Sequence, residues 1–151
     1  MVKIVDGDLL SVTTGIIGQQ VNCKGVMGGG VALQVKNKYY EVYKLYNDLC
    51  LSTRSEDLLG HVQLVSVNDE LIIANIFGQD SFGFGKQQTD VEKLKEAFTE
   101  LALICKIKKQ TLALPYNIGC FRGGANWEEV FKIIEEVFKD VDVTLYRLDR
   151  K

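Results

Sequence analysis

The glycines of this 151-residue chain are concentrated in three clusters, at 25–30, 78–85 and 119–124. Clustered glycines between periodic segments mark backbone that turns tightly or approaches a ligand closely. The first and last clusters each follow an apolar segment typical of a strand, and each precedes a segment with helical spacing. We therefore expect strands and helices to alternate, with two glycine-rich loops where strands lead into helices.

Apolar residues between these clusters recur with the period of strands or of helices. Strands are expected at 2–5, 15–22, 61–67, 71–76, 111–114 and 141–148, and helices at 32–46, 91–105 and 127–138. Helix starts are expected at Thr89, which forms a capping box with Glu92, and at Asn126. The pattern predicts a single α/β domain over 1–151, with a mixed sheet and helices on both faces.

Charge and cysteine content exclude several classes of protein. Lys plus Arg is 18 and Asp plus Glu is 20, so the net charge of −2 argues against a broad nucleic-acid surface. No apolar run reaches the roughly 18 residues of a membrane span, and the acidic Asp6 argues against a signal peptide, so a cytoplasmic location is expected. The four cysteines form no CxxC and His61 is the one histidine, which predicts no zinc site, no disulfide framework and mostly core-filling thiols.

The first glycine loop, residues 21–32, contains three consecutive glycines at an expected helix start. Successive N–H groups there, with the positive end of the helix dipole, can hold an anion or a polyol. The amide of Asn22 can both donate to and accept from a sugar hydroxyl. The alternative is a flexible loop in which Asn22 closes a turn. Neither the GxGxxG nor the GxxxxGK[ST] spacing is present.

The second glycine loop, residues 115–127, also lies between an apolar strand and a helix start. Two such loops side by side could clasp a diphosphate, with Phe121 closing over it; alternatively, Phe121 and Arg122 are ordinary surface residues of a turn. Asp8, directly after the first strand, could accept a hydrogen bond from an exocyclic amine or could cap the turn that follows.

Three motifs together resemble the macrodomain family. They are the Gly-Asp-Leu-Leu element at 7–10, the VNCKGVMGGGVALQ segment at 21–34, and the segment from Leu114-Pro115 through Ile118-Gly119-Cys120 to Gly123-Gly124-Ala125-Asn126-Trp127. They occur in the order expected for the bacterial and phage-type branch. The resemblance implies a three-layer α/β/α sandwich with a cleft for ADP-ribose.

The resemblance also implies roles for individual residues. Asp8 would accept from the adenine amino group beside Leu9, Asn22 would contact the distal ribose, and the strand near Tyr146 would border the adenine. The remaining ligand-binding positions would lie along the two glycine loops, at Gly28, Gly29, Gly30 and Val31, and at Ile118, Gly119, Cys120, Phe121, Arg122 and Gly123.

Two positions depart from the glycohydrolases of this branch. Their catalytic lysine falls on Gln79, whose amide cannot act as a nucleophilic amine, and their aspartate falls on Gly123. Lys86 could substitute from a loop, and Asn22 and Asp80 are the catalytic candidates, Asp80 for positioning a water.

Three functions follow from the resemblance and its departures. The first is binding of ADP-ribose, with hydrolysis of a derivative such as ADP-ribose 1''-phosphate and no cofactor. The alternatives are a non-catalytic module that recognises ADP-ribosylated protein, and an oligomeric scaffold that binds no ADP-ribose.

Overall fold

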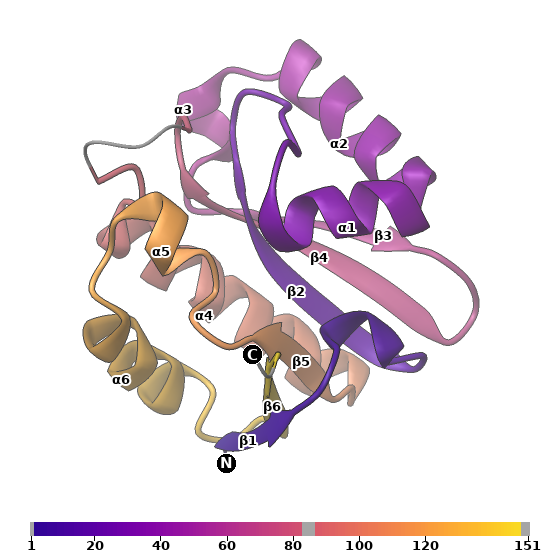
Figure 1. Ribbon diagram of the computed structural model, residues 1–151, viewed down its shortest axis with the longest axis vertical. Coiled ribbons are helices and arrows are strands. Elements are labelled where there is room, and N and C mark those ends of the chain that lie inside the picture. The colour runs from indigo at the N-terminus through magenta and orange to yellow at the C-terminus, as the bar shows by residue number, and fades with distance from the viewer. Residues whose placement is uncertain (1, 83–86, 149–151) are drawn as a thin grey trace.

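The computed structural model describes residues 2–82 and 87–148, so the Lys86 candidate lies outside the described residues (Figure 1). Within these ranges a six-stranded sheet has the order β1-β6-β5-β2-β4-β3. All neighbouring strands are parallel except β3 and β4, so the expected mixed sheet is confirmed. The strands are β1 Val2–Asp6, β2 Gly15–Asn22, β3 Val62–Ser66, β4 Leu71–Gln79, β5 Leu112–Pro115 and β6 Val143–Arg147.

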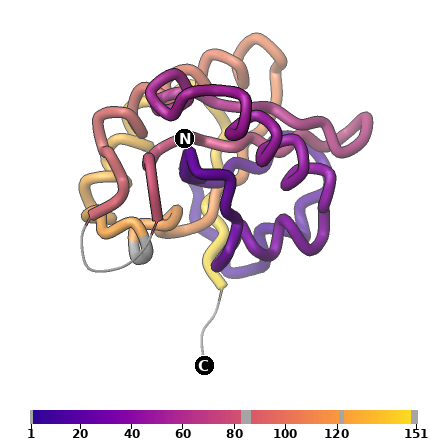
Figure 2. Tube along the Cα trace, turned by 90° about the horizontal axis from the view of Figure 1, so that it is seen from above, coloured from indigo at the N-terminus to yellow at the C-terminus, as the bar shows by residue number. Residues whose placement is uncertain are grey.

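Helices cover both faces of the sheet, which gives the expected α/β/α sandwich (Figures 1 and 2). Residues of α1 and α2 pack on one face, and residues of α4 and α6 pack on the other. The helical elements are the 3₁₀ helix η1 Leu9–Ser11 and the α-helices α1 Gly30–Lys38, α2 Tyr40–Ser52, α3 Ser55–Leu58, α4 Val91–Lys108, α5 Cys120–Gly123 and α6 Trp127–Val137.

The helix expected at 32–46 is two helices, because the backbone breaks at Tyr39. Tyr39 has φ −131° and ψ 71°; its N–H donates to Val35 O at 2.7 Å, and its carbonyl accepts from Val42 N at 2.9 Å. Val35 and Val42 are both buried on the same face of the sheet. The apolar spacing therefore continues across the break and does not reveal it.

The capping box expected at Thr89 and Glu92 is wrong. Asp90 is the N-cap of α4, and its carboxylate accepts from Lys93 N at 3.1 Å. Thr89 is buried, and its hydroxyl instead donates to Gln20 Oε1 at 3.0 Å.

The cap expected at Asn126 is present at the start of α6. Its Oδ1 accepts from Glu129 N at 3.1 Å, which satisfies one of the otherwise unpaired N–H groups of the first turn.

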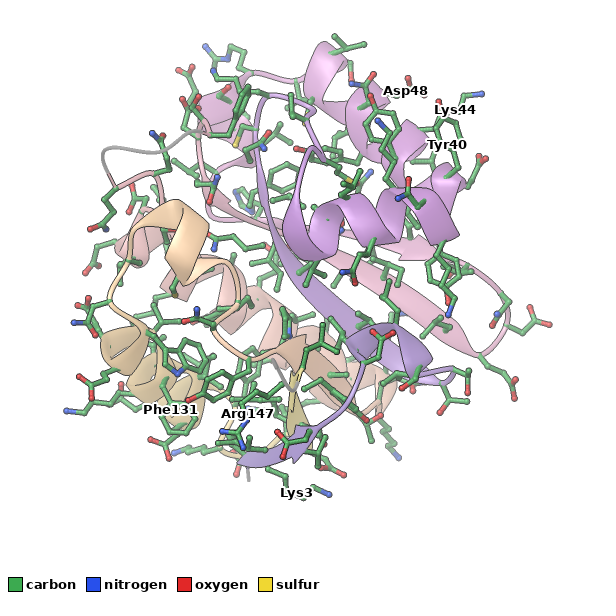
Figure 3. All side chains as sticks on the ribbon, viewed as in Figure 1. Lys3, Tyr40, Lys44, Asp48, Phe131 and Arg147 are labelled. Carbon is green, nitrogen blue, oxygen red and sulfur yellow. The ribbon has the colours of Figure 1, made fainter. Side chains whose placement is uncertain are left out.

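Strand β1 forms one edge of the sheet and is held there by parallel pairing with β6 and by an ion pair. Arg147 Nε lies 2.9 Å from Asp6 Oδ1. Figure 3 shows Arg147 and Lys3 at this edge, while Tyr40, Lys44 and Asp48 project from α2 at the far side of the molecule. The sandwich has two apolar cores, one on each side of the sheet.

The cysteines are all free, and three of them belong to the apolar cores. Burial raises the pKa of Cys23 and of Cys120 to about 12, and the pKa of Cys105 to about 11.

No described helix is long and apolar enough to cross a membrane. Across 2–82 and 87–148, no group of His, Cys, Asp and Glu side chains is arranged to hold a metal ion.

We predict that the free energy of unfolding falls as pH rises above about 9. The buried thiols keep their protons in the folded state, whereas unfolded thiols lose theirs near the ordinary value of 9.0, so the folded state binds more protons. Urea unfolding at about pH 8 and about pH 10 measures the difference. The matched variant Cys105→Ala should show a smaller loss between these two pH values, and an equal loss would contradict the assignment to the thiols.

Candidate functional site

A cleft lies where β2 and β5 cease to pair. The two strands pair only at Ile16 with Leu112 and at Ile17 with Ala113. The chain leaves β2 toward α1 on one face of the sheet and reaches β5 from α4 on the other. Ligands of parallel sheets bind at such a switch point, outside the carboxyl ends of the strands. The cleft at this place has a volume of about 580 Å³.

Both glycine loops line this one cleft, as the sequence predicts. Of the residues expected at the site, the first loop contributes Asn22, Gly28, Gly29, Gly30 and Val31 to the lining, and the second contributes Ile118 and Gly119. Because β2 and β5 are parallel neighbours, the loops that follow them lie at the same edge of the sheet. Two segments almost a hundred residues apart therefore form one surface.

The first glycine loop delivers the open N-terminus of α1 to the cleft. Gly29 is the N-cap, has an extended backbone with φ −163°, and offers no side chain to the first helical N–H groups. Gly30 has φ 60°, a left-handed conformation that glycine adopts without strain. The unpaired N–H groups and the positive end of the helix dipole make this place favourable for an anion.

Asn22 closes the turn of the first glycine loop, and it also lines the cleft. Its Oδ1 accepts from Lys24 N at 2.9 Å and lies 2.8 Å from Tyr46 Oη, and its Nδ2 donates to Val26 O at 2.9 Å. Burial raises the pKa of Tyr46, so its hydroxyl stays protonated and able to donate. An amide nitrogen carries two hydrogens, so Asn22 holds the loop and retains one donor.

The second glycine loop turns through three consecutive left-handed residues, Asn117, Ile118 and Gly119, with φ 75°, 32° and 79°. The N–H groups of Ile118, Cys120 and Gly123 donate to carbonyls within the loop at 3.0, 2.7 and 2.7 Å. These three amides are therefore already paired. Within the described part of the chain, the Gly119 N–H donates to no backbone carbonyl of the loop.

Gln20 ties the second glycine loop to β2. Its Nε2 donates to Ile118 O at 2.8 Å, and its Oε1 accepts from the buried hydroxyl of Thr89. A side chain at Gly119 would bring its Cβ to 3.2 Å from Gln20 Nε2, and one at Gly123 would overlap Thr89 Oγ1. Both glycines are thus needed for the loop to pack this closely.

Other residues expected at the site lie outside the lining of the cleft. Leu9 and Cys120 are buried in the two cores. Asp8 accepts from Leu10 N at 2.9 Å and so caps η1. The adjoining Gly7 N–H donates to Arg147 O at 2.9 Å, which places this turn next to the segment that brings Leu148 to the cleft.

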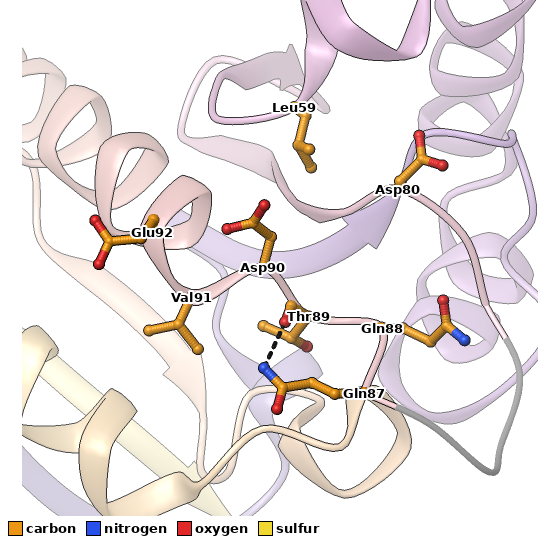
Figure 4. A pocket seen from close by; sticks show the side chains of 8 residues that line it. All are labelled: Leu59, Asp80, Gln87, Gln88, Thr89, Asp90, Val91 and Glu92. Atoms are coloured by element: carbon orange, nitrogen blue, oxygen red, sulfur yellow. Dashed lines mark hydrogen bonds between the residues drawn. The ribbon is translucent and has the colours of Figure 1, made fainter.

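Asp80 lines a separate hollow of about 460 Å³, together with Asp90 and Glu92 (Figure 4). Its carboxylate lies 3.5 Å from Lys24 Nζ, and its carbonyl accepts from Cys23 N. Asp80 directly follows Gln79, which does line the cleft.

Phe121 and Arg122 belong to α5, and their side chains lie outside the described part of the structure. The expectation that Phe121 closes over a diphosphate therefore concerns a side chain outside the described part of the structure.

Several residues of the cleft were missed from the sequence, notably Gln19, Gln20, Tyr116 and Leu148. Two consecutive glutamines inside an otherwise apolar strand were a usable signal, because buried polar groups need a partner or a purpose. The described aromatic residues that line the cleft are Tyr116 of the loop after β5 and Phe82, whereas Tyr146 of β6 packs against a core.

Comparison with known proteins gives consistent likenesses. The chain is 28% identical over 150 residues to the DNA ADP-ribosyl glycohydrolase of Mycobacterium tuberculosis, covering 97% of this chain and 42% of that protein. It therefore spans less than half the length of that relative. It is 27% identical over 154 residues to the ADP-ribose 1''-phosphate phosphatase of Saccharomyces cerevisiae, covering 84% and 86%. No family model matches the sequence.

The structure resembles the macrodomain of Mycobacterium tuberculosis DarG with a TM-score of 0.84 at 28% identity, over 97% of each chain. The likenesses in sequence and in structure both extend over nearly the whole chain. The sheet order and the two glycine loops at one cleft agree with these likenesses. The chain has the macrodomain fold.

Proposed function

We propose that the cleft binds the ADP-ribose group, either free or attached to a protein. The observation that carries this proposal is that both glycine loops line one cleft at the switch point of the sheet. The names of the similar proteins support it, since both describe chemistry of ADP-ribose derivatives. The cytoplasmic location expected from the sequence stays a prediction.

Three parts of ADP-ribose, the diphosphate, the distal ribose and the adenine, have a chemically suitable partner. The diphosphate suits the open N-terminus of α1 and the Gly119 amide, because N–H groups stabilise anionic oxygens. The remaining Nδ2 hydrogen of Asn22 suits a hydroxyl of the distal ribose. Asp8 uses Oδ1 in its cap, and its second carboxylate oxygen would accept from the adenine amino group.

The activity we propose for the site is hydrolysis of ADP-ribose 1''-phosphate. Water attacks the terminal phosphorus, the bond from phosphorus to the sugar oxygen breaks, that oxygen takes up a proton from the water, and inorganic phosphate and ADP-ribose are released. Such a reaction depends mainly on positioning and on N–H donors around the phosphate. Asn22 would orient the distal sugar, and Asp80, next to the cleft residue Gln79, is the candidate for positioning water.

Glycosidic cleavage by the lysine and aspartate of the related glycohydrolases is not supported. Gln79 lines the cleft, but its Nε2 donates to Ser81 O at 2.7 Å, and an amide is no nucleophile. A Cβ at Gly123 would overlap Thr89 Oγ1, so the loop has no room there for a carboxylate side chain.

A non-catalytic module that recognises ADP-ribosylated protein is the second candidate. The described residues that line the cleft include no carboxylate, histidine, lysine or cysteine. General acid–base catalysis needs a group that exchanges protons near neutral pH. The lack of such a group among the described lining residues is the observation that favours this second candidate.

We predict that the chain binds ADP-ribose and that Gly29→Val lowers the affinity at least about tenfold. The extended backbone at Gly29 accepts any residue, so the variant should fold, while its branched side chain occupies space in the cleft. Calorimetric titration measures the affinity, and Gly29→Ala provides a smaller obstruction that should cost less. A folded Gly29→Val protein with normal affinity would remove the first glycine loop from the site.

A second prediction separates turnover from binding. Incubation with ADP-ribose 1''-phosphate should release phosphate faster with the unsubstituted protein than with Gly29→Val, because the substituted cleft cannot position the substrate. Colorimetric detection of phosphate follows the reaction. Equal rates, combined with normal ADP-ribose binding by the unsubstituted protein, would reject hydrolysis and leave the non-catalytic module.

A further inference from the structure

Gln19 presents an unpaired hydrogen-bond acceptor beside the cleft. It lies in β2, two residues past the last pairing of β2 with β5, and it lines the cleft although only 1% of the residue is exposed. Its Nε2 donates to Asn75 Oδ1 at 2.8 Å. Its Oε1 is buried, and within 2–82 and 87–148 nothing donates to it. Buried polar atoms are rarely left unpaired, so this oxygen calls for an explanation.

The orientation of the Gln19 amide is fixed by a series of hydrogen-bonded side-chain amides on three strands. This relay consists of Gln19, Asn75 and Gln63. Asn75 in β4 lies opposite Gln19 and donates through Nδ2 to Gln63 Oε1 in β3 at 3.0 Å. Gln63 Nε2 donates to Leu45 O of α2 at 3.2 Å. A backbone carbonyl only accepts, so it sets the orientation of each amide in turn. The relay therefore leaves Gln19, a lining residue of the cleft, with an unpaired oxygen and not with an unpaired NH₂ group.

We propose that Gln19 is a specificity-determining residue whose Oε1 accepts a hydrogen bond from a ribose hydroxyl of the bound ligand. The inference rests on the proposed binding of ADP-ribose and names a recognition contact within it. A sugar hydroxyl can donate to this oxygen, whereas a diphosphate oxygen near neutral pH is an acceptor and is repelled by it. The acceptor thus helps to fix which part of the ligand lies over β2.

Asn75 and Gln63 are positioning residues in this scheme. They lie farther from the cleft in β4 and β3, and neither lines it. Their contribution is the orientation of the Gln19 amide. If Gln63 loses its acceptor oxygen, Asn75 can turn its Nδ2 toward Gln19, which would then turn its own NH₂ group toward the cleft.

Calorimetric titration with two probes, ADP-ribose and inorganic pyrophosphate, tests the proposal. Gln19→Met removes the acceptor at nearly constant length and should weaken ADP-ribose binding about tenfold, while pyrophosphate, which has no sugar hydroxyl, should bind within about twofold of normal. Gln63→Met should weaken ADP-ribose binding about threefold. Gln63→Glu keeps an acceptor for Asn75 Nδ2 and should restore the affinity to within about twofold.

Each contrary result overturns the inference. Equal loss of both probes in Gln19→Met would mean that the residue only shapes the cleft or holds a water there. Unchanged ADP-ribose binding in Gln19→Met would exclude the contact while leaving the proposed function intact. If Gln19→Met does not fold, as judged by thermal unfolding, equal affinities of Gln63→Met and Gln63→Glu would reject the relay. No ADP-ribose binding by the unsubstituted protein would overturn the proposed function and this inference together.

Discussion

Every property of the cleft depends on the short pairing between β2 and β5. Two registered residue pairs hold the strands together, and beyond Ile17 and Ala113 they are free to separate. Parallel pairing places the loops after both strands at one edge, and the helices that follow β2 and precede β5 pack on opposite faces. A longer β2–β5 ladder would close the space between the glycine loops, so the cleft exists because the sheet is incompletely paired there.

The polar groups of this cleft are chiefly amides, and none of the described side chains that line it is charged. The open turn of α1 supplies N–H groups, Asn22 and Gln20 hold the two loops, and the buried Gln19 supplies an oxygen. Amide groups have fixed geometry and do not titrate, so a site built from them keeps its hydrogen-bonding pattern across the physiological pH range. Their cost is burial, which hydrogen bonds offset for the side-chain amides of Asn22 and Gln20 but not for Gln19 Oε1.

The sequence was sufficient for features that local spacing encodes. The alternation of strands and helices, the Asn126 cap and the two glycine loops follow from periodicity and from the backbone freedom of glycine. Contacts between distant residues were not accessible in this way. Gln20 bonds to Thr89 and to Ile118, which are 69 and 98 positions away, and the first of these contacts also explains why Thr89 does not cap α4. Likewise, Asp80 lies close to Lys24 because the loops after β2 and β4 meet.

An amide-resolved NMR titration with ADP-ribose tests the shared cleft most directly. If one ligand is held between the two glycine loops, the backbone amides of 28–31 and of 117–119 should shift together, with one common dissociation constant. Shifts confined to a single loop, or different constants for the two loops, would contradict the account.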